Sequence, residues 1–252
     1  MNIGAVIQSF ETSTSTNDLA KMFAEKGAEE GTVIMAEEQT GGRGTKGRSW
    51  ESPRGKGLYA SVVLRPKQKD ISLLPLMAGV ACVDAIRGAT GLEVKLKWPN
   101  DIVWGKKKLG GILSESGFLG EEVTYVVLGL GLNVSQRRND FPEELRRSAT
   151  SLRLALRAET DRAELERILW SALDRWHALF RQGKTEKIIK AYEAYFIIPI
   201  GNIVIVEKEG GALSGAFLGV DPRGRLRLEK NGQEMSLSPA EIQGLSGGGR
   251  GR

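Results

Sequence analysis

One segment of twelve residues concentrates the groups that bind anions. Residues 39–50, the glycine loop, read QTGGRGTKGRSW, with four glycines, three cations and no carboxylate. Glycines let the backbone approach a ligand closely, and consecutive N–H groups form an anion-binding concavity to which the cations add charge. Short apolar runs at 32–36 and 58–64 predict a strand on each side. We therefore predict a phosphate-binding loop between two buried strands, in place of a mobile basic surface loop.

Two common nucleotide-binding patterns partly match this loop, but neither is expected. The glycines at 42, 44 and 47 have the spacing of the dinucleotide fingerprint, and residues 42–49 differ by one residue from a Walker A loop. Both patterns must open a helix, whereas residues 48–55 contain too many helix breakers. The loop is predicted to bind phosphate in a different fold.

The composition places the chain among ordinary globular proteins. It has 252 residues, 40% hydrophobic and 27% charged, which suits one large domain and a small second one. There is no signal sequence and no apolar run of the ~18 residues that a membrane span needs. The single cysteine, Cys82, excludes an internal disulfide and a thiolate metal cluster. We expect a cytoplasmic protein with no membrane contact.

The net charge of +5 raises the question of nucleic-acid binding. The cations are dispersed, however, and no helix-turn-helix or zinc-finger pattern occurs, so no specific DNA binding is expected. Mild basicity also suits an enzyme that handles ATP and an acidic protein substrate.

Periodicity predicts an α+β chain in two parts. For the first part we expect strands at 3–10, 32–36, 58–64, 94–98, 101–104, 109–116 and 123–130, and helices at 16–26, 70–89, 162–181 and 185–196. Beyond Pro199, short strands at 204–207, 212–220, 226–229 and 234–237, separated by glycine, asparagine and aspartate turns, predict a small barrel. The expected domains are 1–198 and 199–246, followed by a disordered tail at 247–252.

A second polar motif is KWPND at 97–101. Pro99 interrupts an apolar, strand-like stretch, as happens at sheet edges and binding sites. Asn100 and Asp101 offer oxygens that could hold a ribose, an adenine edge or Mg²⁺, although on their own they are more typical of an ordinary turn.

Glycines accompany the remaining polar candidates. Lys108 is either a solvated turn lysine or a ligand-binding one, since Gly110 and Gly111 after it allow close approach. In the segment 128–134, LGLGLNV, alternating glycines indicate that something packs closely against the strand, which ends near Asn133.

Two polar groups on helices have ordinary interpretations. Ser15, Thr16 and Asn17 lie at the N-terminus of the helix predicted at 16–26. They could cap this helix, with Ser15 and Asp18 forming a capping box, or point at a small polar ligand. His177 is the only histidine, so we interpret it as an interfacial helix residue, which weakens a Ser/His/Asp hydrolase interpretation.

The order and spacing of these motifs resemble the biotin–protein ligase family over roughly residues 5 to 245. The resemblance implies a mixed β-sheet with flanking helices, like the catalytic domains of class II aminoacyl-tRNA synthetases, plus a small SH3-like C-terminal barrel. It is closest to the form without an N-terminal DNA-binding domain.

The family activity implied is a two-step reaction. Biotin and ATP, with Mg²⁺, give biotinyl-AMP and pyrophosphate, and a lysine of a biotin carboxyl carrier protein then takes the biotin. Such chemistry depends on positioning and charge stabilisation and needs little acid–base machinery. Family members dimerise in several cases, so a homodimer is an expectation too.

The resemblance assigns the biotin site residue by residue. The ureido end would be held by Ser15, Thr16 and Asn17, and the tail by Gln39. Arg43 and the N–H groups of Gly44 and Thr45 would surround carboxylate and phosphate, with Gly111 leaving room for biotin. Lys108, with Arg43, would be catalytic at the junction of carboxylate and phosphate.

The nucleotide site follows in the same way. ATP would be held by Arg43, Arg48, Trp50, Asn100 and Asn133, and Asp101 would contact Mg²⁺. The chain departs from the familiar loop at Thr45, where an arginine is usual, and Lys46 beside it could compensate. The alternatives are a lipoate or octanoate ligase of the same fold and a non-catalytic biotin sensor.

Overall fold

The computed structural model describes residues 2–68 and 70–248. Its larger part is built on a seven-stranded sheet with the order β1-β2-β3-β7-β6-β5-β4. Only β1 and β2 pair in parallel, and the other neighbours run antiparallel. The strands are β1 (Ile7–Phe10), β2 (Val33–Ala36), β3 (Gly57–Leu64), β4 (Lys95–Lys97), β5 (Asp101–Trp104), β6 (Lys107–Leu119) and β7 (Glu122–Asn133).

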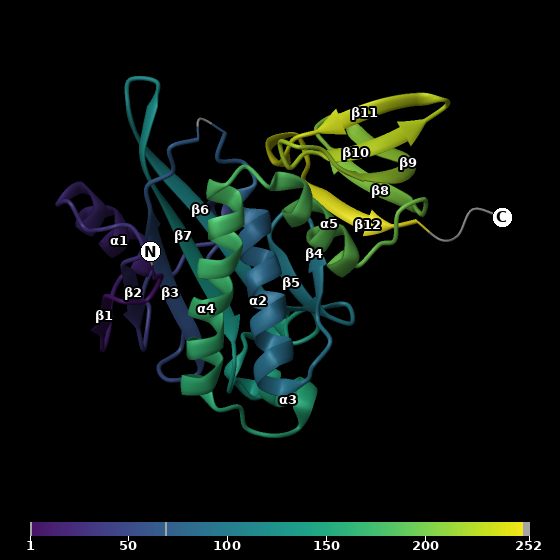
Figure 1. Cartoon of the computed structure of the whole chain (residues 1–252). Coiled ribbons are helices and arrows are strands. Elements are labelled where there is room, and N and C mark those ends of the chain that lie inside the picture. Colours follow the sequence, from purple (N-terminus) through teal and green to yellow (C-terminus); the bar gives the residue numbers. More distant parts are fainter. Residues whose placement is uncertain (1, 69, 249–252) are drawn as a thin grey trace.

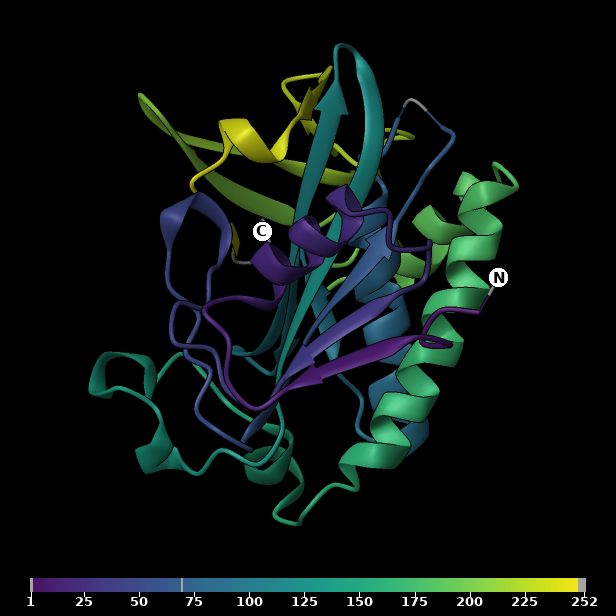
Figure 2. The ribbon, with the colours of Figure 1, turned by 90° about the vertical axis from the view of Figure 1, so that its left-hand side faces the viewer.

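Helices cover the two faces of this sheet unequally. One face carries α2 (Leu74–Thr90) and α4 (Arg162–Arg181), with the short α3 (Leu152–Leu156) before α4 and α5 (Thr185–Tyr195) after it (Figure 1). Alternate residues of β3 and β7 pack on α2 and α4 in the main core. The other face carries α1 (Thr16–Glu25), whose two buried alanines join a small second core with β2, β3 and β7 (Figure 2). That thinly covered face leaves room for a ligand site.

The C-terminal part is a separate antiparallel sheet with the order β11-β10-β9-β8-β12. It packs on the larger part through Phe196 and Phe217, whose ring centroids lie 4.7 Å apart, and through Trp98, whose Nε1 donates to Gly224 O at 2.9 Å. Its strands are β8 (Ile203–Lys208), β9 (Gly211–Val220), β10 (Leu226–Lys230), β11 (Gln233–Leu237) and β12 (Gly244–Gly247).

The expected α+β class is confirmed, with local differences. β1 begins at Ile7, because residues 3–6 form a turn in which Gly4 has φ 85°. α2 begins at Leu74, since the Asp70 carboxylate accepts from Ser72 N and holds a turn there. One α-helix and one strand of the described residues were not expected, α3 and β12, and both are short. Gly247, expected in the tail, belongs to β12, whereas residues 249–252 of that tail lie outside the described residues.

No helix in the described ranges is both long and apolar enough to cross a membrane.

Candidate active site

A pocket on the α1 side of the sheet gathers every residue expected to bind biotin. The N-terminus of α1, the glycine loop and strands β6 and β7 form its walls. Its lining comprises Ser15, Thr16, Asn17, Gln39, Arg43, Gly44, Thr45, Trp50, Asn100, Lys108, Gly111, Ile112, Leu113, Gly129, Leu130 and Gly131.

Hydrogen bonds fix the end of the pocket at α1. Thr16 donates from its backbone N (2.8 Å) and its Oγ1 (3.1 Å) to Gln39 Oε1. Ser61 Oγ lies 2.8 Å from Thr16 Oγ1 and 2.6 Å from Asn17 Oδ1. Thr16, Asn17 and Ser61 are buried, so these groups form a rigid polar surface. Ser61 was not predicted from the sequence, although a small polar residue within an otherwise apolar strand is a usable signal.

The expected capping box at α1 is wrong. Ser15 occupies the cap position but makes no side-chain capping bond, and Asp18 turns its carboxylate to Arg43. Ser15 is buried and lines the pocket, which favours the ligand-facing alternative.

Two glycines of β7 explain the alternating pattern in the sequence. A Cβ on Gly129 would lie 2.2 Å from Asn17 Oδ1, and a Cβ on Gly131 would lie 2.7 Å from Trp50 Nε1. Asn17 and Trp50 therefore lie directly on the bare backbone of the strand, and the expected close packing is confirmed.

The glycine loop closes on itself and contacts the C-terminal part of the chain. Trp50 N donates to Gly42 O at 2.9 Å and Gly44 N to Arg48 O at 2.7 Å. Lys46, in the left-handed region with φ 59°, donates from Nζ to Ile242 O. Lys46 lines neither this pocket nor the adjoining one around Arg48 and Asn133, so the idea that it compensates for Thr45 has no support in the structure.

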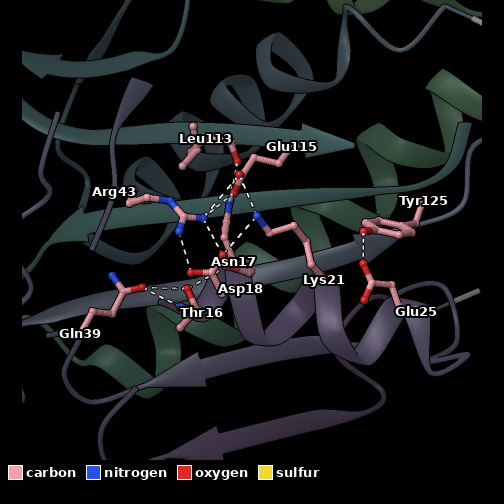
Figure 3. A network of polar contacts seen from close by, with 11 residues as sticks. Thr16, Asn17, Asp18, Lys21, Glu25, Gln39, Arg43, Leu113, Glu115 and Tyr125 are labelled. Atoms are coloured by element: carbon pink, nitrogen blue, oxygen red, sulfur yellow. Dashed lines mark hydrogen bonds and ion pairs between the residues drawn. The ribbon is translucent and has the colours of Figure 1, made fainter. Parts of the chain in front are cut away.

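Arg43 leaves the loop toward two carboxylates beside α1 (Figure 3). Its guanidinium donates to both oxygens of Asp18, at 2.6 and 2.7 Å, and to Glu115 Oε2 at 3.1 Å. These hydrogen bonds raise the pKa of Arg43 and, from the other side, lower that of Asp18. Glu115 on β6 was not predicted from the sequence.

Lys108 stands where two pockets meet. Its Nζ lies 2.5 Å from Asp101 Oδ1 and 5.4 Å from the centroid of the Trp50 ring. Both pockets are lined by Lys108, Trp50, Gly44 and Thr45. One cation can therefore act on groups bound in either pocket.

The second pocket holds most of the expected nucleotide residues. Arg48, Trp50, Asp101 and Asn133 line it, together with Phe141, Leu145 and Ala149 from the segment after β7. These three apolar residues were not predicted from the sequence as part of a site.

The two expected asparagines of the nucleotide site have protein partners. Asn100 belongs to the first pocket and donates from Nδ2 to Ile112 O at 2.7 Å. Asn133 is buried, donates to Thr150 O at 2.9 Å and accepts from Gln136 Nε2 at 3.0 Å.

The described residues do not build a resident metal site. They include no group of three or more His, Cys, Asp or Glu side chains able to hold a metal ion, and the Asp101 carboxylate is paired with Lys108. Cys82 is buried, and its burial raises the pKa of the thiol to about 12, so it is not a nucleophile at neutral pH.

Comparisons with known proteins agree with this geometry. Residues 8–133 match the biotin/lipoate A/B protein ligase family, and residues 200–248 match the biotin protein ligase C-terminal domain. The bifunctional ligase/repressor BirA of Bacillus subtilis is 38% identical over 91% of this chain and 71% of its own length. The biotin–[acetyl-CoA-carboxylase] ligase of Mycobacterium tuberculosis is 32% identical over 92% of this chain and 86% of its own.

A solved structure extends the similarity to the whole fold. The biotin protein ligase of Aquifex aeolicus in complex with biotin and ATP superposes with a TM-score of 0.83 at 27% identity, covering 97% of this chain and 100% of the other. Because sequence and fold agree over both parts, the chain belongs to the biotin protein ligase family.

Proposed function

We propose that this chain is an ATP-dependent biotin–protein ligase that forms biotinyl-AMP and then biotinylates a lysine of a carrier protein. The observation that carries the proposal is the position of Lys108 in the lining of two adjoining pockets. One pocket has the fixed polar end that a ureido group needs, and the other combines an arginine with apolar and aromatic groups, as suits a nucleotide.

In the first step a biotin carboxylate oxygen attacks the α-phosphorus of ATP, and pyrophosphate leaves. Ser15, Thr16 and Asn17 would bind the ureido group and Gln39 the tail. The N–H groups of Gly44 and Thr45 would face the carboxylate and phosphate, beside Arg43. The ammonium of Lys108 would offset the negative charge that accumulates as the two anions meet.

The nucleotide would lie in the second pocket. We propose that Arg48 contacts the phosphates and that Trp50 and Asn133 border the base and ribose, with Asn100 at the junction. Mg²⁺ would arrive with ATP as part of the substrate, since Mg²⁺ is commonly held by substrate phosphates and one or two carboxylates. Asp101 is the carboxylate proposed to meet it.

In the second step the carrier lysine, as a neutral amine, attacks the acyl carbon of biotinyl-AMP. An amide forms, the bond to the phosphate oxygen breaks and AMP leaves. The names of several relatives, biotin–[acetyl-CoA-carboxylase] ligase, support a carboxylase carrier domain as the acceptor.

Lipoate and sensor functions are less well supported, because the relatives are named as biotin ligases and both Arg43 and Lys108 are present. The cytoplasm is the proposed location, in keeping with a single reduced cysteine.

A homodimer through β6 is also proposed. β5 pairs only with residues 107–111 of β6, so among the described strands the far edge of β6 has no partner from about residue 114 onward. An open strand edge is a template for pairing with another chain, and Phe118 and Leu119 near its end are 60% and 76% exposed. Sedimentation analysis should give a dimer that Leu119→Asp weakens, and a wild-type monomer at all concentrations would contradict this part.

Pyrophosphate exchange tests the activity. Exchange should depend on biotin and should not be supported by lipoate or octanoate offered separately, and a purified carrier domain should gain biotin in single turnover. Exchange with lipoate alone would overturn the proposal, and tight biotin binding without any exchange would indicate the sensor.

A further inference from the structure

Four charged side chains form one cluster at the α1 edge of the biotin pocket. The ion-pair cluster consists of Asp18 and Lys21 on α1, Arg43 in the glycine loop and Glu115 on β6 (Figure 3). Two cations face two carboxylates, so the cluster is neutral. It joins three segments that are distant in the sequence.

Arg43 is the only member of the cluster that comes from the loop. Its contact with Asp18 is bidentate, with NH1 on Oδ2 and NH2 on Oδ1, and bidentate arginine–carboxylate pairs are both strong and geometrically specific. Arg43 lines the pocket, whereas Asp18 and Glu115 do not. Arg43 therefore connects the pocket lining to two acids outside it.

Glu115 connects this ion pair to the polar end of the pocket. Its Oε2 accepts from Asn17 Nδ2 at 2.7 Å and its Oε1 from Lys21 Nζ at 2.9 Å. Burial alone would raise the pKa of Glu115, but the hydrogen bonds from Asn17 and Lys21 and the charges of Lys21 and Arg43 lower it overall. One carboxylate thus holds both the amide expected at the ureido group and the arginine of the loop.

We propose that Asp18 and Glu115 are positioning residues that hold the loop against α1 and β6 through Arg43 and so set how fast biotin leaves. The guanidinium of Arg43 holds the loop in place through these ion pairs, while the loop's backbone N–H groups bind the phosphate. The proposal rests on the proposed placement of biotin between α1 and the loop. Because the side chains are partly exposed, we expect each removed contact to speed biotin dissociation by roughly two- to tenfold.

The test measures biotin dissociation and steady-state kinetics in the full chain. Asp18→Asn and Glu115→Gln keep side-chain size, and Arg43→Lys keeps the charge but loses the bidentate contact. All three should release biotin faster without ATP. In Asp18→Asn and Glu115→Gln, kcat at saturating biotin and the KM for ATP should stay close to wild type. Glu164→Gln is the matched control, because it breaks an exposed pair with Arg167 on α4 and should leave biotin release unchanged.

Exchanging the charges of Asp18 and Arg43 separates two roles of Arg43, holding the loop closed and binding phosphate. The double variant Asp18→Arg with Arg43→Asp can rebuild the contact between α1 and the loop, but it replaces the cation at position 43 of the loop with an acid. Slow biotin release should return in the double variant relative to either single one. The proposal would be overturned if Asp18→Asn and Arg43→Lys both released biotin at the wild-type rate. A raised KM for ATP as the only change in these variants would overturn it too.

Thr16→Val distinguishes failure of the cluster from failure of the biotin placement. If Thr16→Val weakens biotin binding and Asp18→Asn does not, the placement stands and the closure role is wrong. If neither weakens binding, the placement itself is wrong and the closure role fails with it.

Discussion

Lys108 Nζ lies 2.5 Å from Asp101 Oδ1 across the hairpin of β5 and β6. A register shift after Ile102 brings Val103 opposite Lys108 and leaves Asp101 opposite Gly111. A Cβ on Gly111 would lie 3.3 Å from Lys108 Cε and 3.4 Å from its Nζ. The bulge, the carboxylate and the bare glycine together direct the ammonium toward the junction of the two pockets.

Lys108→Ala should keep biotin binding but lose most adenylate formation. The ammonium acts on charge that develops as carboxylate and phosphate meet, so its loss should lower exchange by on the order of 10²-fold or more. Lys107→Ala is the control, because Lys107 precedes Lys108 on β6 and lines neither pocket. Biotin-dependent pyrophosphate exchange near the wild-type rate in Lys108→Ala would show that the lysine has another role.

Gly129→Ala and Gly131→Ala should separate the two substrates, although they lie two residues apart on one strand. The first would press on Asn17 and the second on Trp50. We therefore expect Gly129→Ala to weaken biotin binding and Gly131→Ala to raise chiefly the KM for ATP. Calorimetric titration with biotin and kinetics with ATP measure the two effects. Equal losses of both substrates in both variants would contradict this division of the site.

The long elements of the fold follow from the sequence because local signals agree with tertiary packing. α4 runs from Arg162 to Arg181 as expected, with Asp161 accepting from Glu164 N at its start. β12 was missed because GLSG has no alternating pattern, and it forms only because β8 offers it an edge. The additional length of β6 likewise comes from its partner β7, since much of this long hairpin is polar.

The pocket residues were predictable by type, but their partners were not. Composition indicates that Arg43 will bind an anion, yet nothing local indicates that Asp18, 25 residues earlier, is that anion. Likewise, the glycines of β7 predict a close approach without saying that Asn17 and Trp50 make it. Such pairings depend on which faces of distant elements the sheet brings together, and this information is absent from any single motif.

His177 should make stability depend on pH. It is buried on α4 next to Glu30, Asp174 and Arg181 and is stacked with Phe180, and neither ring nitrogen has a hydrogen-bond partner among the described residues. Burial lowers the pKa of His177 below its ordinary value of 6.5, although the nearby acids oppose this. As pH falls through 6.5 the unfolded chain gains a proton that the folded chain does not, so stability falls.

Urea unfolding at about pH 7.5 and about pH 5.5 checks this expectation. His177→Leu removes the only histidine, so it should lose less stability between the two pH values than wild type does. The same loss in both proteins would exclude His177 as the cause.

Thr45→Arg should slow the escape of biotinyl-AMP. Thr45 lines both pockets, so a guanidinium there could make bidentate contact with the phosphate of the intermediate. The neighbouring Lys46 does not supply this charge, because its Nζ donates to Ile242 O, just before β12 in the C-terminal part. Thr40→Arg adds the same charge at an exposed position of the loop that lines neither pocket, and it should leave release unchanged. A chase of labelled biotinyl-AMP measures the rate of release. Equal rates for wild type and Thr45→Arg would show that a threonine at this position holds the intermediate as well as an arginine does.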